Sequence, residues 1–550
     1  MSTRRDSRTD DAHSRAEHLL DRRALMQRGV ALGLSLPVIG ALGSLASAPV
    51  AAAQDAGSGG VLVFDLGSEP ENLDPHQMLA YTTSLLVGQM FEGLVRFAPG
   101  TLEVEPWLAE SWESSEDGLD WTFILRKGVT FHDGTPFNAD AVKFSFDRQM
   151  DESSPYYKMG QWSTATDLAI IDSVTAEGDD TVTFHLTGPY SKFLSRMTGA
   201  LDWIVSPAAV EKFGETFLEN PVGTGPYQLD RWEKGQQVVL RRNDTWWNGK
   251  PGLDEIYFRA IPEEGARLAA LLSGEVNMAL DIGPETVDLL RASDAHTVAS
   301  GPTGSVWFLA MNVESEPFTD LKVRQAVNYA IDKRAIVEDV LRNTVETAYG
   351  PLSPGFEEYN PKVETYFSYD PEKATALLAE AGWPADREVV FRCSIGGSGM
   401  LLPEEMATVI QDNLRAIGMQ TRLEVTEFVS WMDAIRSEQN ELTVMSWNVA
   451  PTEPDFVFNG ILTKAAFPPG FNTSYWTDEE NEKLVASALT TADPAEAKAD
   501  YQRAQEIVME QAPIVPVCHR QQIFGYTKTI QNFSPMPSMA LDLINVWIQS

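Results

Sequence analysis

The stretch EVVFRCSIGGSGMLLPEEMATVIQDNLRAIGMQTRLEVTEFVSWMDAIRSEQNELTVMSWNV, residues 388–449, alternates short apolar runs with longer amphipathic segments. The apolar runs have the length and composition of strands, and the longer segments have the period of helices. The pattern predicts three strands and two helices, at 388–395, 403–417, 420–427, 430–438 and 442–449. Strands that alternate with helices form a sheet covered by helices, so this part of the chain predicts an α/β lobe.

Further helices are expected on both sides of this stretch. One begins near Asp320 and keeps apolar residues as far as Leu341 on one broad face. Another has Asp370 as a natural N-cap, and the last long helix ends before Pro513. An apolar strand at 514–518 follows, and then a tail without helical period.

The first half of the chain reads differently. Short apolar or alternating runs at 61–64, 121–125 and 181–186 predict strands, and glycine, proline and aspartate punctuate the segments between them. Residues 61–310 therefore predict strand-rich, mixed α/β structure. A single core rarely grows beyond about 250–300 residues, so a chain of 550 residues is expected to form at least two lobes.

Composition excludes several classes of protein. A formal charge of −37 argues against nucleic-acid binding, which needs clustered Lys and Arg. The excess of acidic residues is explained by the solubility that it gives the protein; the alternative is that it attracts a cationic ligand. The two cysteines, Cys393 and Cys518, are too few for a disulfide-rich fold or a zinc cluster, and the sequence leaves open whether they pair.

The N-terminus has the features of an export signal. A polar start contains the pair Arg22-Arg23, a Gly/Ala-rich apolar stretch runs over 29–50, and an Ala-x-Ala sequence ends at Ala53. We expect a twin-arginine-type signal peptide over 1–53 and a flexible leader over 54–60, the alternative being an uncleaved anchor. No cysteine stands near the cleavage point for lipid attachment, so the predicted location is periplasmic or extracellular.

The sequence lacks the familiar catalytic and metal-binding motifs. The sequence contains no H-E-x-x-H zinc motif and no phosphate-binding glycine loop, and 396–400 is not a nucleophile elbow. The histidines beyond the signal have no metal-ligand spacing. We therefore predict no metal, no cofactor and no enzymatic activity. Fourteen tryptophans instead suit a protein that buries a small organic molecule in an apolar cleft.

Several long phrases then match a known family in order along the chain. They are LAESWESSEDGLDWTFILRKGVTFHDGTPFNADAVKFSFDR at 108–148, PVGTGPY at 221–227, RNDTWWNGKPGLDEIYFRAIPEE at 242–264 and YDPEKATALLAEAGWP at 369–384. With these phrases the sequence resembles the family 5 extracytoplasmic solute-binding proteins of ABC importers, the peptide/nickel type that includes dipeptide- and oligopeptide-binding proteins.

The resemblance implies an α/β fold of the two-lobed periplasmic-binding-protein type (type II, the large cluster with an extra subdomain), with the ligand cleft between the lobes. Lobe I would comprise 61–310 plus 520–550, with a subdomain at about 95–220, and lobe II would comprise 311–519. The chain would cross the hinge near Met311 and near His519.

The function implied is capture of a small organic solute, peptide-like or oligosaccharide-like, by lobe closure. The partners would be a membrane permease and its ATPase, with no nucleic acid, and the protein would be a monomer. Two alternatives remain, because fold does not dictate role. One is a ligand-sensing receptor component, and the other is a secreted hydrolase with a nucleophile or a carboxylate pair in the cleft.

The resemblance also implies where the ligand binds. The candidate ligand-binding residues are Tyr81, Thr82, Trp307, Gly397, Ser398, Phe428, Trp431, Trp447 and Asn448. Peptide-binding relatives place an aspartate where this chain has Ala450, and a basic residue in the loop that matches 396–399, which is uncharged here. A buried ammonium or carboxylate without a partner is costly, so the sequence favours an oligosaccharide or a blocked peptide over a free zwitterionic dipeptide.

Overall fold

The computed structural model describes residues 59–549 except 79, 158–167, 200–201, 397–400, 437–439 and 492. The predicted signal peptide, all but the last two residues of the leader, and the candidate residues Gly397 and Ser398 lie outside this description. No helix within the described ranges is both long enough and apolar enough to cross a membrane.

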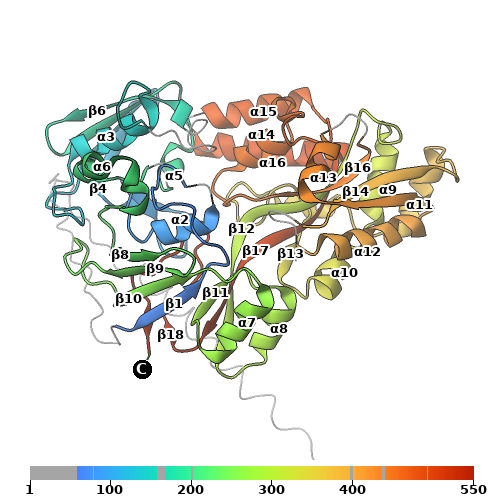
Figure 1. Cartoon of the computed structure of the whole chain (residues 1–550). Helices are drawn as coiled ribbons and strands as arrows, with labels where there is room; N and C mark the ends of the chain where they lie inside the picture. The colour runs from blue at the N-terminus through green and yellow to red at the C-terminus, as the bar shows by residue number, and fades with distance from the viewer. Residues whose placement is uncertain are drawn as a thin grey trace, which may run out of the picture. The chain divides into compact units, whose positions relative to one another are not determined.

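Within the described ranges, eleven strands form the largest sheet, in the order β15-β14-β16-β12-β17-β11-β1-β10-β9-β8, with β13 paired to β17 (Figure 1). The strands are β1 (Val61–Asp65), β8 (Tyr227–Glu233), β9 (Gln237–Arg242), β10 (Glu255–Arg259), β11 (Met278–Leu280), β12 (His296–Met311), β13 (Val345–Thr347), β14 (Glu388–Ser394), β15 (Gln420–Thr426), β16 (Leu442–Trp447) and β17 (Ile514–Thr527).

The βαβαβ prediction for 388–449 is confirmed. β14 pairs in parallel with both β15 and β16, and the helices α12 (Pro403–Ala416) and α13 (Phe428–Ile435) connect them. α12 buries Met406, Ile410 and Leu414, which recur every four residues along one face. The parallel register follows from these crossovers, because parallel strands need a long connection between them.

The prediction of one continuous helix from Asp320 was wrong. α9 (Leu321–Ala330) stops at Ile331, whose backbone is extended, and α10 (Lys333–Ala335) and a π-helical turn (Ile336–Val340) follow. The break has a local cause, because the Asp332 side chain accepts a hydrogen bond from the Ala335 backbone N–H at 3.0 Å and starts a new helix.

The strand predicted at 514–518 is much longer than expected. β17 continues to Thr527 and runs antiparallel to β12, with which it pairs from His296↔Thr527 to Ala310↔Ile514. The pairing shifts between Pro302 and Val306, which marks a β-bulge. One pair of strands thus crosses the centre of the whole sheet.

A separate four-stranded sheet has the order β4-β5-β7-β6, and its strands β4 and β5 come from the phrase at 108–148. Its strands are β4 (Ala109–Ser114), β5 (Asp120–Leu125), β6 (Ile171–Glu177) and β7 (Thr181–Leu186). Two further two-stranded sheets pair β2 (Val95–Phe97) with β3 (Val104–Pro106), and β18 (Ile530–Gln531) with β19 (Trp547–Ile548). The predicted strands at 121–125 and 181–186 are confirmed as β5 and β7.

The remaining helices cover the sheets. They are α2 (Tyr81–Val87), α3 (Ala139–Met150), α5 (Phe193–Arg196), α6 (Pro207–Phe213), α7 (Glu264–Ser273), α8 (Pro284–Arg291), α11 (Pro371–Glu380), α14 (Pro454–Ile461), α15 (Glu479–Thr490) and α16 (Pro494–Gln511), with 3₁₀ turns at Leu168–Ile170, Gly214–Glu219, Pro361–Thr365 and Lys464–Ala466. Asp370 caps α11 through the Lys373 N–H, as the sequence predicts.

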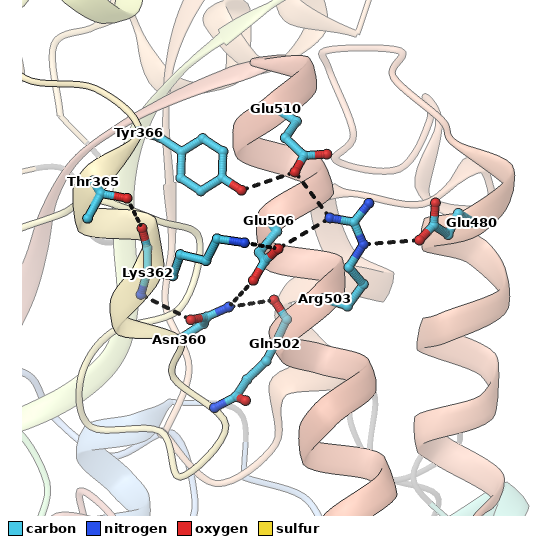
Figure 2. Close-up of polar contacts among 9 residues, drawn as sticks. All are labelled: Asn360, Lys362, Thr365, Tyr366, Glu480, Gln502, Arg503, Glu506 and Glu510. Atoms are coloured by element: carbon cyan, nitrogen blue, oxygen red, sulfur yellow. Dashed lines mark hydrogen bonds and ion pairs between the residues drawn. The ribbon is translucent and has the colours of Figure 1, made fainter.

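Polar contacts tie the 3₁₀ turn Pro361–Thr365 to α16 (Figure 2). Lys362 and Arg503 both bind Glu506, at 2.7 and 3.3 Å, and the Asn360 amide donates to the Gln502 carbonyl oxygen at 2.9 Å. Surface ion pairs such as these stabilise weakly. These contacts matter more for position than for stability, because they hold Asn360 and Lys362, which follow Glu358 in the chain, against α16.

A buried ion pair joins the beginning of the chain to α3. Arg148 donates to Asp74 through both terminal nitrogens and to His76 Nδ1 at 2.9 Å. His76 Nε2 lies 2.9 Å from the Trp203 carbonyl oxygen, so the neutral ring donates there and accepts from Arg148. Burial and the nearby guanidinium lower the pKa of His76 to about 4.

Replacing Arg148 with Met is predicted to lower the free energy of unfolding by about 3–5 kcal/mol, because Asp74 would stay buried without its cation. Urea denaturation measures the loss. The double variant Asp74→Asn with Arg148→Met should recover part of it. Arg415→Met, which breaks an exposed pair with Asp412, should cost no more than about 1 kcal/mol. Equal losses for the two Arg→Met variants would contradict this interpretation.

Candidate functional site

A cavity of about 660 Å³ lies where the two long central strands meet α2, the loop after β16 and the C-terminal segment 536–544. Its lining is mixed, with aromatic and aliphatic side chains next to three arginines and several acidic and amide groups. This combination of an apolar body and a few polar groups is typical of small-molecule sites.

The β-bulge of β12 forms one wall. Thr303 and Ser305 both line the cavity, and the Thr303 hydroxyl donates to the Arg520 carbonyl oxygen of β17 at 2.7 Å. Between them, Gly304 donates its N–H to the Val449 carbonyl oxygen at 2.9 Å. A side chain at Gly304 would come within 2.8 Å of the Ala450 carbonyl oxygen. The bulge thus brings the loop after β16 against the central strands, as bulges beside binding sites often do.

A second wall is held by hydrogen bonds around Tyr81. The Tyr81 hydroxyl donates to the Met539 carbonyl oxygen at 2.6 Å, and Gln522 of β17 donates its amide N–H to the same hydroxyl. Gln522 is itself almost fully buried. Three distant segments, α2, β17 and the C-terminal tail, are thereby fixed to one another beside the cavity.

Glu92 is a buried carboxylate on the cavity wall surrounded by indole donors. Its Oε1 accepts from Trp107 Nε1 at 2.8 Å and Trp246 Nε1 at 3.1 Å, and its Oε2 accepts from Trp247 Nε1 at 3.0 Å. Burial raises the pKa of Glu92 to about 7, although these donors and Thr224 oppose the rise. The indoles satisfy both oxygens, so Glu92 organises the wall and is not a free acid or base.

Buried charges lie at and behind the third wall, where Arg196 and Glu453 line the cavity. Arg196 at the end of α5 pairs with Glu453 and lies 3.6 Å from Asp455 at the start of α14. Lys192, also next to α5, pairs with Glu358. All five side chains are mostly buried, so the pairs are shielded from solvent and held by each other.

Hydrogen bonds join Ser191, two residues before α5, to the C-terminal part of α15. The Ser191 hydroxyl donates to the Ala488 carbonyl oxygen at 2.9 Å, and the Ser191 N–H donates to the Leu489 carbonyl oxygen at 3.3 Å. The side chain of Leu489 also packs on the core of the four-stranded sheet. This bridge joins the predicted lobe I subdomain to predicted lobe II, away from β12 and β17.

The predicted ligand-binding residues are not all together. Tyr81 and Asn448 line the cavity. Thr82 lies beside Tyr81 on α2, where its hydroxyl hydrogen-bonds Ser68 at 2.7 Å, but it is not part of the lining. Trp307 in β12 is fully buried in the core. Gly397 and Ser398 lie outside the described residues.

The other three candidates lie near β16 but outside the cavity lining. Phe428 and Trp431, both on α13, pack against each other with ring centroids 5.5 Å apart. Trp431 Nε1 donates to the Thr443 hydroxyl at 3.2 Å. Trp447 donates from Nε1 to the Phe456 carbonyl oxygen at 2.9 Å and packs on Phe471. Ligand contact by any of the nine candidates stays a prediction.

Sequence reasoning missed Arg196, Arg520, Gln522 and the tail 536–544, all of which line the cavity. No local motif marks them, because their places depend on contacts between segments far apart in the sequence, such as Arg196 with Glu453 and Thr303 with Arg520. Within the described part of the chain, no group of three His, Cys, Asp or Glu residues is placed to hold a metal ion. Cys393 and Cys518 are buried free thiols.

Comparison with known proteins decides the family. The family model described as bacterial extracellular solute-binding proteins, family 5 Middle, matches residues 103–469. The chain belongs to this family. The predicted resemblance is therefore confirmed, and so is the two-lobed periplasmic-binding-protein fold.

Individual members of family 5 match nearly the whole chain. The dipeptide-binding protein of Escherichia coli K12 is 32% identical over 494 residues, which are 84% of this chain and 91% of that protein. HbpA2 from Haemophilus parasuis superposes with a TM-score of 0.83 at 29% identity, over 89% of this chain and 100% of that one. The ABC transporter-associated periplasmic binding protein DppA from Helicobacter pylori, solved with the peptide STSA, has a TM-score of 0.73 at 28% identity and covers 90% of this chain and 99% of that one.

The raised pKa of Glu92 gives a testable pH dependence. Between pH 4.5, the ordinary pKa, and about 7, the folded protein keeps a proton that the unfolded chain releases. The stabilisation that Glu92 provides is therefore complete below pH 4.5 and is lost as pH rises through about 7.

Measured against Glu92→Gln, the wild-type advantage in free energy of unfolding should shrink between pH 5 and pH 8, by at most about 1.4 kcal/mol per pH unit. The buried histidines titrate in both proteins and cancel in the difference. Urea denaturation over this pH range measures it. A difference that is constant with pH, or grows, would be incompatible with a raised pKa.

Proposed function

We propose that this family 5 protein is the extracytoplasmic substrate-binding component of an ABC importer and that it captures a peptide-like solute by lobe closure. The observation that carries the proposal is the cavity of about 660 Å³ at the junction of the two predicted lobes. Support for the ligand class comes from relatives, one named a dipeptide-binding protein and another solved with the peptide STSA.

The proposed lobes are 61–310 with 520–550, and 311–519. The distribution of buried side chains supports this division except at 306–310, which the boundary assigns to lobe I but which pack in one core cluster with residues 311–518. The other clusters draw theirs from 62–290 and 523–546. The lobes would turn about the bulge at Pro302–Val306, where the register of β12 and β17 shifts.

The proposed role is binding without catalysis, in the periplasm or outside the cell. Family members named above are binding proteins, which supports the first part. The predicted twin-arginine-type signal at 1–53 supports export. The proposed membrane partners are the permease and ATPase, and the binding protein would act as a monomer. The ligand proposed here is peptide-like, whereas the sequence alone favours an oligosaccharide or a blocked peptide.

Native mass spectrometry of the purified protein, followed by thermal-shift measurements with dipeptides, tetrapeptides and oligosaccharides, tests this function. A solute that binds only the folded protein stabilises it by about 2.7 kcal/mol at 100 times its Kd. We expect peptides to raise Tm in a concentration-dependent manner and to be recovered unchanged. Binding of oligosaccharides alone, or hydrolysis of the peptides, would refute the proposal.

Lobe closure makes a separate prediction about Lys192, whose ion pair with Glu358 bridges the predicted lobes without lining the cavity. Lys192→Met should weaken peptide binding several-fold, because the closed form loses a buried pair and its population falls. The matched control is Lys362→Met, which breaks a pair with Glu506 inside predicted lobe II. Isothermal titration calorimetry should find the control unchanged, and equal affinities for both variants would argue against closure.

A further inference from the structure

Three arginines line the cavity, and two of them are occupied by acidic groups. Arg96 pairs with Glu105 at 2.7 Å and lies over the Trp107 ring at 3.5 Å. Arg196 pairs with Glu453. These two cations are neutralised by the protein and serve its own packing.

Arg520 differs from both. Its guanidinium donates no hydrogen bond within the described residues, and the nearest acidic atom there is Asp281 Oδ1 at 3.9 Å. At that distance the two charged groups form an ion pair, but they are too far apart for a hydrogen bond. Its side chain is nonetheless only 25% exposed. A cationic side chain that is three-quarters withdrawn from solvent, and whose guanidinium donates no hydrogen bond within the described residues, is ready to bind an anion.

The backbone explains why Arg520 lies on the cavity wall. It stands in β17 opposite the bulge of β12, between Gln521, which pairs with Pro302, and His519, which pairs with Val306. The Thr303 hydroxyl binds the Arg520 carbonyl oxygen, and β13 pairs with the same residue through Val345. The strand is therefore held on both sides, and the guanidinium belongs to a rigid element.

We infer that Arg520 binds a carboxylate of the captured solute through two parallel N–H···O bonds. A carboxylate matches the planar fork of a guanidinium, whereas a neutral hydroxyl or amide uses it poorly. Asp281 stays beside the pair and compensates the cation when the cavity holds no anion. The inference rests on the proposed peptide-like ligand and narrows it to peptides with a free carboxylate.

This assignment removes one objection to a free peptide. The loop 396–399, where the resemblance to peptide-binding relatives implies a basic residue, is uncharged in this chain. The structure offers one from β17 instead, at a position that no linear motif marks. A ligand carboxylate buried here would not lie unpaired.

Isothermal titration calorimetry of the full-length protein tests the inference with alanyl-phenylalanine, methionyl-leucine and Ser-Thr-Ser-Ala, each as free acid and as C-terminal amide. Wild-type protein should bind the acids about 10- to 100-fold more tightly than the amides, the range of one charge-assisted hydrogen-bonded pair. Arg520→Gln should raise the Kd of the acids to near that of the amides. Arg520→Lys should restore part of the preference.

Arg415→Gln is the matched control, since its ion pair with Asp412 is exposed and outside the cavity, and its preference should equal that of wild type. If Arg520→Gln fails to fold, the same comparison on Arg520→Lys decides, because its preference for the acids should be weaker than that of wild type. Equal binding of acids and amides by wild type, or an unchanged preference in Arg520→Gln, would overturn the inference and leave peptide capture intact. Failure of every acid and amide to bind wild type would reject the peptide function and this inference together.

Discussion

The pairing of β12 with β17 is the constraint on which the rest of the structure depends. These strands are 16 and 14 residues long and lie at the centre of the eleven-stranded sheet. Toward Met311 they belong to the core built from 306–518, and toward His296 they meet the core that includes Leu271 and Leu290. The cavity lies at their bulge because the register shifts there, and the shift turns Thr303, Ser305 and Arg520 toward one place.

Because the chain is strongly acidic, the acidic partners of its basic side chains help to decide how its segments are joined. With a net charge of −37, most basic side chains find acidic partners nearby. Lys192 and Arg196 use theirs to join the predicted lobes, and Arg148 uses Asp74 to fix the first loop on α3. Buried pairs of this kind add little net stability over apolar packing, but they specify which surfaces meet. Arg520 differs from the other two arginines of the cavity because its guanidinium donates no hydrogen bond to an acidic group within the described residues.

Local patterns predicted a large share of the fold. The cap at Asp370, the apolar spacing of α12 and the short runs of β14 to β16 each encode an element within a few residues, and the structure confirms them. The break at Asp332 was not predicted, because the apolar face continues through it while the side chain starts a new helix. The length of β17 was missed for a related reason, since Arg520 to Gln522 interrupts the apolar pattern.

The site was harder to predict. Tyr81 and Asn448 line the cavity, but tryptophan as such did not distinguish core from pocket, as Trp307 and Trp431 are both buried. Arg520, Gln522 and the tail near Met539 reach the cavity through pairings more than 200 residues apart along the chain. Such contacts leave no trace in local sequence spacing.

The central claim is that two lobes close on a solute, and the distance between them in solution tests it most directly. Spin labels on Gln236→Cys and Glu372→Cys would stand at exposed positions of predicted lobes I and II. Burial raises the pKa of both native cysteines, Cys393 and Cys518, to about 12, so they should stay unlabelled. A saturating peptide is predicted to shift the measured distances toward a shorter, narrower distribution. A distribution that is unchanged while the peptide binds would contradict closure.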